Sequence, residues 1–150
     1  MMKNRNTRVL KLTALGLVGF HFLTVVLHSV AHEVLSVKAT PAQLAFIVPV
    51  IILAPLIAGL ALPKFMRAGA ALLLASMVGS FVFGLYYHFV ADTIDHVAHV
   101  AHREPAFWST TFRVTAFLLA VSEVFGAAAA GTLTAGRSRL FKQYATRTGF

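Results

Sequence analysis

The chain of 150 residues contains no cysteine and few charged residues, and acids are the scarcest of these. Without cysteine the chain cannot form disulfides, thiolate metal sites or iron–sulfur clusters, and it has no cysteine nucleophile. Any metal site must therefore use the side chains of His, Asp and Glu.

The sequence motifs of common enzymes are also absent. The chain has no Gly-rich phosphate loop, no GxSxG elbow, no HExxH pair and no glycosidase-like pair of acids. An ordinary hydrolase or kinase is therefore not indicated, and the sequence does not identify an enzyme of another kind.

Apolar residues dominate what is present. Hydrophobic residues make up 58% of the chain and charged residues only 12%, a mixture far from that of a soluble globular domain. The composition predicts an integral membrane protein whose main partner is the lipid bilayer. A net charge of +8 would favour nucleic acid as a partner of a soluble protein. Here the basic residues gather at the termini and in one short loop, so no nucleic-acid partner is expected.

Four apolar runs are long enough to cross the ~30 Å hydrocarbon core of a bilayer, which takes a helix of ~20 residues. Thr40 followed by Pro41 has the pattern of a helix N-cap with proline in the first turn. Residues 92–103 are too polar for hydrocarbon but keep helical periodicity. The expected fold is all-α, a single membrane domain over residues 1–150, built as a four-helix bundle with a polar His/Asp helical extension between helices 3 and 4. The expected spans are residues 12–35, 42–62, 68–91 and 107–134.

The distribution of basic residues predicts the orientation. With four spans, both termini and the turn at residues 64–67 lie on one side, which then holds ten of the thirteen Lys and Arg residues. The other three are Lys38, Arg103 and Arg113. Because Lys and Arg concentrate on the cytoplasmic side of membrane proteins, both termini are expected in the cytoplasm. We expect a multi-pass protein of the bacterial inner (plasma) membrane.

A group of histidines is predicted to meet near the outer membrane face. At ~100° per residue, His28 and His32 share one face of the first helix, and His88 and Asp92 share one face of the third. Counting from the helix ends places His32 and His88 ~5 Å in and His28 ~10 Å in, close enough for them to meet. The hypothesis is a transition-metal site made by these four residues, for zinc, copper or iron. Additional ligands could come from the polar extension, at Asp95, His96, His99 or His102.

Two alternatives to this metal site remain open. A histidine pair on opposing helices would also suit haem b, which would make the protein a small electron carrier. Alternatively the imidazoles bind no metal and hydrogen-bond to one another, to Ser or Thr and to interfacial water. The protein would then be a non-catalytic accessory subunit of a membrane complex, with a membrane-protein partner or as a homo-oligomer.

A second polar pair is predicted deeper in the bundle. His21 and Glu123 lie at similar depths on the first and fourth helices, and a buried carboxyl group needs a partner. One interpretation is a structural hydrogen bond that fixes the register of the two helices. The other is a proton or cation relay from the outer cluster.

The pattern of these residues resembles a group of bacterial proteins. Tyr86-Tyr87-His88-Phe89 is followed by Asp95-His96-Val97-Ala98-His99, with the HxxxH pair at residues 28–32 before them and Glu123 after. In this the chain is similar to small uncharacterised, His-rich, four-span integral membrane proteins of bacteria. The resemblance covers most of the chain and implies the four-span fold, but no established activity or ligand.

Overall fold

A computed structural model describes the backbone of residues 2–148 and the side chains of residues 6–135. The described residues form helices and no strand, as the sequence predicts. Two of the helical segments, η1 and η2, are wider π-helices. In chain order the elements are α1 (Met2–Val34), α2 (Pro41–Phe46), η1 (Ile47–Leu53), α3 (Ala54–Ala61), α4 (Met66–Leu85), η2 (Tyr86–Val90), α5 (Val97–Val100) and α6 (Ala106–Thr148).

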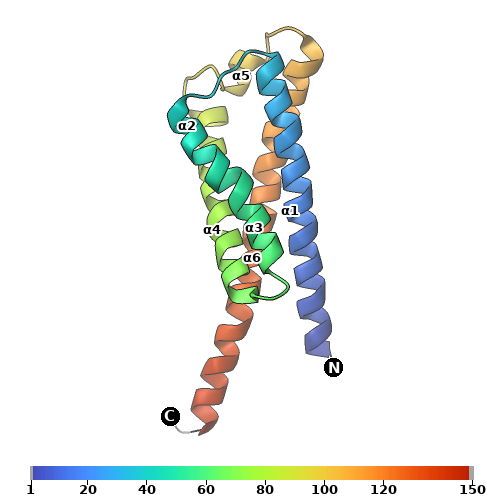
Figure 1. Ribbon diagram of the computed structural model, residues 1–150, viewed down its shortest axis with the longest axis vertical. Helices are drawn as coiled ribbons and strands as arrows, with labels where there is room; N and C mark the ends of the chain where they lie inside the picture. The colour runs from blue at the N-terminus through green and yellow to red at the C-terminus, as the bar shows by residue number, and fades with distance from the viewer. Residues whose placement is uncertain (1, 149–150) are drawn as a thin grey trace.

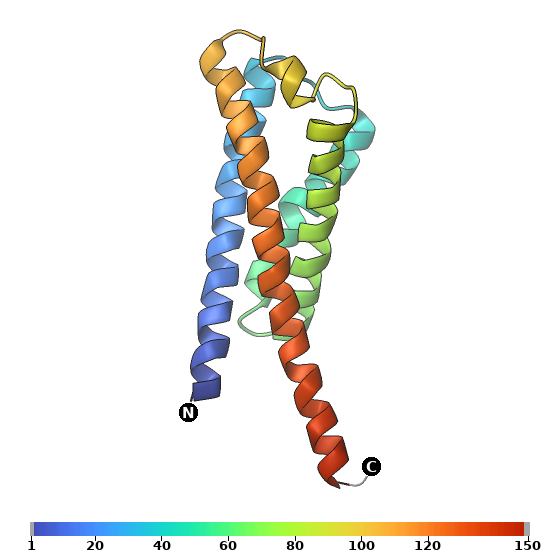
Figure 2. The ribbon, with the colours of Figure 1, turned by 180° about the vertical axis from the view of Figure 1, so that it is seen from behind.

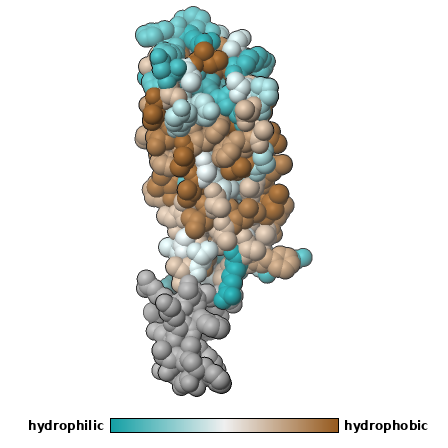
Figure 3. All heavy atoms as spheres, turned by 90° about the vertical axis from the view of Figure 1, so that its left-hand side faces the viewer, coloured by the Kyte–Doolittle hydropathy of each residue, from teal (hydrophilic) through white to brown (hydrophobic). Residues whose placement is uncertain are grey.

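Four long helical rods lie side by side and alternate in direction (Figures 1 and 2). The first is α1, the second is α2, η1 and α3 in succession, the third is α4 with η2, and the fourth is α6. Within the described part of the chain, each rod contains a stretch long and apolar enough to cross a membrane. Figure 3 shows hydrophobic residues around the middle of the bundle and hydrophilic residues at one end. The four stretches are Asn6–Val34, Pro41–Ala61, Met66–Val90 and Ala106–Ala135.

The two ends of the bundle differ. Both chain termini lie at one end, here called the terminal end, and the loops at residues 35–40 and 91–105 lie at the other, here called the histidine end (Figure 1). Helix α6 is central, because α1 and α4 both pack along it, while α3 packs on α4 and more lightly on α1. The first and third rods are therefore held together mainly through the fourth.

The terminal end is closely packed by small and apolar residues. A methyl group added at Gly69 would lie 2.8 Å from the backbone nitrogen of Leu62 and 2.9 Å from the carbonyl oxygen of Ala58. Only glycine allows α3 and α4 to approach this closely where they join. The buried apolar residues of this region are Ala14, Val18, Ala58, Leu62, Ala70, Leu73, Met77, Ala129, Ala130 and Leu133.

The third helix does not continue through residues 92–103, so the predicted His/Asp helical extension is wrong. The helix ends at Val90, and Ala91 takes an extended conformation with φ −75° and ψ 134°. The Thr93 hydroxyl donates to the carbonyl oxygen of Tyr87 over 3.4 Å, which satisfies one of the acceptors left free at the helix end. Short polar side chains that bond to nearby backbone favour turns over helix, and this competition overrides the periodic pattern. Turns and the four-residue helix α5 replace the extension.

A turn with a left-handed residue ends α1. Ser36 has φ 53°, the Ser36 N–H donates to Glu33, and the Val37 N–H donates to the carbonyl oxygen of His32 over 2.9 Å. This pattern is a Schellman motif, in which the left-handed residue reverses the chain direction. The reversal buries Val37 against Ala31. It also returns the Val37 backbone to the last turn of α1.

The predicted start of the second rod is confirmed. Thr40 caps α2, its side chain accepts from the backbone N–H of Gln43, and Pro41 occupies the first turn. The side-chain oxygen of Gln43 accepts in return from the Thr40 N–H over 2.7 Å, which completes a capping box. The remaining amide group of Gln43 is thereby free to point toward the centre of the bundle.

Candidate metal centre

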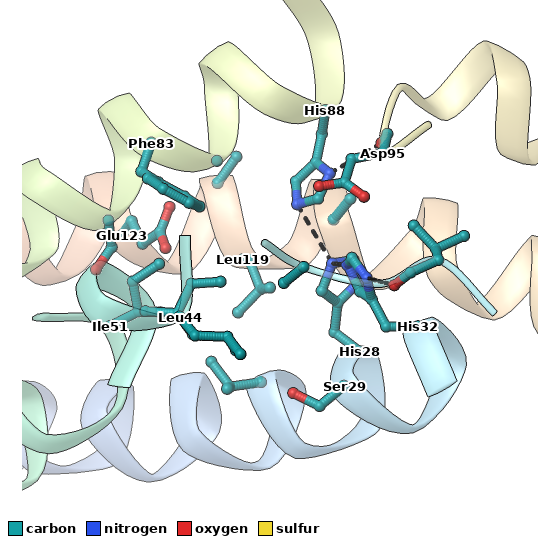
Figure 4. Close-up of a pocket in the computed structure, with 18 of the residues that line it drawn as sticks. His28, Ser29, His32, Leu44, Ile51, Phe83, His88, Asp95, Leu119 and Glu123 are labelled. Atoms are coloured by element: carbon teal, nitrogen blue, oxygen red, sulfur yellow. Dashed lines mark hydrogen bonds between the residues drawn. The ribbon is translucent and has the colours of Figure 1, made fainter. Parts of the chain in front are cut away.

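Three imidazole rings meet at the histidine end of the bundle. The Nε2 atom of His28 lies 3.2 Å from Nε2 of His32 and 3.3 Å from Nε2 of His88. The three ligand atoms all lie within 4.8 Å of one another (Figure 4). His28 and His88 are buried, whereas His32 is partly exposed. The rings bridge the space between α1 and η2, and η2 continues α4, which packs on α6 as α1 does.

The opposite nitrogen of each ring faces an oxygen. Nδ1 of His32 donates to the carbonyl oxygen of Val37 over 2.9 Å, which the turn after α1 has brought back to it. Nδ1 of His88 donates to the carbonyl oxygen of Asp95 over 3.1 Å. Nδ1 of His28 lies 2.8 Å from Oγ1 of Thr115.

These partners fix the tautomers of the rings. A carbonyl oxygen only accepts, so His32 and His88 must carry a hydrogen on Nδ1. The Thr115 hydroxyl uses its hydrogen toward the carbonyl oxygens of Thr111 and Phe112, at 2.7 and 3.0 Å, so it accepts from Nδ1 of His28. In their neutral forms all three rings therefore turn a bare Nε2 lone pair toward the same point. Three acceptors without a hydrogen between them repel one another unless a cation or a proton lies there.

A single aromatic ring packs against all three histidines. The ring centroid of Phe112 lies 4.6 Å from His28, 4.7 Å from His32 and 5.4 Å from His88. Phe112 is fully buried and belongs to the small apolar cluster that also includes Val100. It restricts the orientations that the imidazoles can adopt, so the three Nε2 atoms are held in place from behind.

Asp95 lies beside His88 with an unusual set of contacts (Figure 4). Its side chain is buried, and Oδ2 accepts from the side-chain amide of Gln43 over 3.2 Å. Oδ1 is buried and has no hydrogen-bond partner among the described residues. A buried carboxylate oxygen without a donor is costly and is suited to a cation or a ligand. Asp95 does not belong to the group of ligand atoms that already lie together, but it lines the same cavity as the three rings.

The other predicted ligands lie away from the three rings. The Asp92 side chain is 91% exposed and pairs with Nε2 of His99 over 3.2 Å, so the structure does not bring it to His28. Nδ1 of His96 accepts from the Ala98 N–H and caps α5. His102 is exposed in the following turn. The break of the helix after Val90 explains these positions, because it separates the residues that helical periodicity would have aligned with His88.

A cavity of about 290 Å³ extends from the three histidines into the bundle. Asp95 lines it at the histidine end, and Glu123 lines it deeper down (Figure 4). Residues from all four rods form its walls. The apolar part of the lining includes Val25, Leu44, Ile47, Ile51, Phe83, Ala116, Leu119 and Ala120.

The deeper pair is also buried in the bundle interior. Nδ1 of His21 lies 4.0 Å from Oε1 of Glu123, and the two residues are 1% and 3% exposed. Nε2 of His21 lies 3.2 Å from the carbonyl oxygen of Ile51, and Nδ1 lies 3.3 Å from Oγ of Ser122. Pro55 stands four residues after Ile51 and has no N–H, so the donor that an ordinary α-helix would give the Ile51 oxygen is missing. His21 supplies that donor.

Four of these contacts could not be read from the sequence. Thr115, Phe112 and Gln43 support the site from distant points of the chain, and the Val37 carbonyl belongs to the backbone. No periodic pattern marks a backbone carbonyl as a partner. Two Thr residues four positions apart in a membrane span, as at positions 111 and 115, give at most a weak indication that one of them supports a histidine.

No protein-family model matches the chain, and no curated protein or solved structure matches it either.

Proposed function

We propose that this protein is an integral membrane protein that binds one transition metal ion through His28, His32 and His88 near the outer membrane face. The observation that carries the proposal is the arrangement of hydrogens on the three rings. Each Nδ1 hydrogen is used by an oxygen acceptor, so three Nε2 lone pairs face one point with no donor among them. A metal ion removes this repulsion, and the oxygen partners are the kind of outer shell that orients ligating histidines.

The ligand atoms suit an intermediate divalent ion. At a zinc–nitrogen distance of ~2.0–2.1 Å, the ligands of a tetrahedral ion lie ~3.3–3.4 Å apart. The two separations at His28 are 3.2 and 3.3 Å, and the third pair of nitrogens, on His32 and His88, lies within 4.8 Å. Imidazole nitrogens bind zinc, copper and iron, and these three metals are the candidates. Three histidine ligands leave the fourth position for Asp95, water or a further ligand.

Haem b fits this arrangement less well. Two axial histidines bind on opposite faces of the haem, so the macrocycle must lie between their rings. Nε2 of His28 and Nε2 of His88 are only 3.3 Å apart, with His32 beside them. A single small ion suits this space and a porphyrin does not.

The test is the metal content of the detergent-purified protein from cells grown in metal-replete medium. We expect about one equivalent of a single transition metal in the wild type. The double substitution His28→Ala with His88→Ala should remove it while the protein remains in the membrane fraction. A matched double substitution of two exposed histidines, His99→Ala with His102→Ala, should leave the metal content unchanged. A wild type without stoichiometric metal would overturn the proposal and favour the accessory-subunit alternative.

We propose further that the histidine end faces outward and that both termini lie in the cytoplasm. The support is the concentration of ten of thirteen basic residues toward the termini and the turn between α3 and α4. The natural chain has no cysteine, so single cysteines can report the topology. A cysteine introduced by Lys38→Cys should react with an impermeant maleimide in intact cells, and one introduced by Lys64→Cys should not. The reverse labelling pattern would overturn the orientation.

A further inference from the structure

The cavity behind the metal centre has polar groups at its two ends and apolar walls between them. At the histidine end stand the three imidazoles and the unpartnered Oδ1 of Asp95. At the deep end stand Glu123 and Ser80. The Ser80 side chain is fully buried, and its hydroxyl oxygen also has no hydrogen-bond partner among the described residues. Both ends of the cavity thus contain a buried polar atom that lacks a partner.

The distance between the two ends is the same when it is counted along α6 and along the third rod. Glu123 follows Thr115, the partner of His28, by eight residues, and Ser80 precedes His88 by eight residues. Eight residues of helix rise ~12 Å. None of the residues that line the cavity lies nearer the terminal end than Ile51, Ser80 and Glu123. Among the described residues, the cavity is therefore a chamber that ends at this level.

One side of the chamber, between the first and second rods, faces the outside of the bundle. Helix α1 packs against α3, but it makes no comparable contact with α2 or η1, and Figure 1 shows the two rods diverging toward the histidine end. Ser29 on α1 and Leu44 on α2 both line the cavity, and both are exposed. A molecule dissolved in the outer half of a bilayer could therefore enter between the first and second rods.

We infer that this chamber binds a small lipid-soluble aromatic molecule with oxygen atoms at opposite ends of its ring system, the chemistry of a quinol. One oxygen takes the open position on the metal ion beside Asp95, and the other meets Glu123 and Ser80. The inference rests on the proposed function for its outer contact, whereas the contacts at the deep end do not depend on the ion.

The lining distinguishes this ligand from the acyl chain of a membrane lipid. An acyl chain would place an apolar end against the Ser80 hydroxyl, which would stay without a partner, and this is unfavourable in a buried site. A ring with a second oxygen satisfies this hydroxyl. The volume of about 290 Å³ lies at the small end of ligand sites and suits one ring system, with any tail leaving between α1 and α2.

The experiment uses 2-heptyl-4-hydroxyquinoline N-oxide, a fluorescent ring compound with oxygen atoms para to one another and a short tail. Titration of the detergent-solubilised full-length protein should give saturable quenching that decylubiquinol reverses. Ala120→Leu fills the cavity and should abolish quenching, whereas the same change at the exposed Ala128 should have no effect. Glu123→Gln should weaken binding by about tenfold, since the amide does not reproduce the hydrogen bond between the carboxyl group and the ligand.

The metal content of each sample separates this inference from the proposed function. Wild type that contains the metal but shows no saturable quenching overturns the ligand chamber and leaves the metal site standing. Saturable quenching that is lost in Ala120→Leu from protein without metal supports the chamber and overturns the metal site. If wild type and Glu123→Gln bind the quinoline N-oxide with equal affinity, with or without metal, then the ligand oxygen at the deep end does not contact Glu123.

Discussion

The described residues include two buried histidine sites, which differ in the partners that face the ring nitrogens. At His21 the two ring nitrogens face acceptors, the carbonyl oxygen of Ile51 and the hydroxyl of Ser122, whose own hydrogen goes to Leu119 over 2.8 Å. Glu123 lies 4.0 Å away. Each ring nitrogen thus has an oxygen partner and the carboxyl lies nearby, so this site is satisfied without any ligand. At the site of His28, His32 and His88 every hydrogen is directed outward and three lone pairs remain.

The difference shows what separates a structural histidine from a ligand in an apolar bundle. Both sites are buried, and both have well-placed oxygen partners, so neither burial nor hydrogen bonding distinguishes them. The distinguishing feature is the direction of the unused lone pairs. At His21 they have an acid nearby in Glu123, whereas at the three-histidine site no acid hydrogen is present among the direct contacts, and this is the place that we propose for an ion.

Acidification should separate the two sites most strongly. Each ligating nitrogen must be free of a proton, so up to three protons compete with the ion as the pH falls. In the range where all three rings take up a proton, the apparent dissociation constant of the metal should rise by up to ~1000-fold for each unit of pH. Metal retention after dialysis at a series of decreasing pH values measures this. Retention that stays constant down to the pH at which the protein unfolds would show that the ion is not held by histidines.

Substitution of Glu123 should affect stability and leave the metal in place. Glu123→Leu removes the proton source and the counter-charge of His21, and we expect a loss of ~2–3 kcal/mol in the free energy of unfolding. Glu123→Gln keeps the volume and a polar group, so its effect should stay below about 1 kcal/mol. Thermal or denaturant unfolding in detergent compares the two variants at equal metal loading. If Glu123→Leu loses the metal while its stability is unchanged, then Glu123 does not belong to a structural site separate from the metal site.

The smallest expected effect concerns Thr115. Thr115→Val keeps the shape of the side chain but removes the acceptor that holds the hydrogen of His28 on Nδ1. Outer-shell partners of this kind contribute about 10- to 100-fold to metal affinity, and we expect the lower end because Phe112 still restrains the ring. Competition with a chromophoric chelator measures the change. Thr111→Val on the same helix is the control, since its exchange leaves the His28 contact intact.

Part of this architecture could be predicted from the sequence because it depends on the length of the apolar runs. Apolar length predicts the helices, and the observed ends lie within a few residues of the predicted spans at Val34, Pro41 and Val90. The depth argument placed His32 and His88 at one level and His28 one helical turn deeper, and the ligand atoms of the three residues do lie together. Where helical periodicity was the only guide, at Asp92, it failed, because turn formation after Val90 depends on local side-chain bonds.

The rest of the site could not be predicted, because it depends on tertiary contacts between segments with no pairing signal. Asp95 and not Asp92 lies beside His88, and it is held there by Gln43 from a different rod. The cavity likewise depends on the divergence of α1 from α2, and no residue pattern in either helix specifies that divergence.

The position of α6 between α1 and α4 has a consequence for how the protein is assembled. Since His28 and His88 stand 60 residues apart and their helices meet mainly through a third, an ion bound to both would act as a cross-link. By the chain-entropy relation used for disulfides, closing a loop of this length is worth ~4 kcal/mol. The first two ligands emerge early in synthesis, but the third follows only when α4 is complete, and the three rings are aligned only after α6 has docked. The ion would thus be loaded last, and its arrival would lock a bundle that had already been inserted.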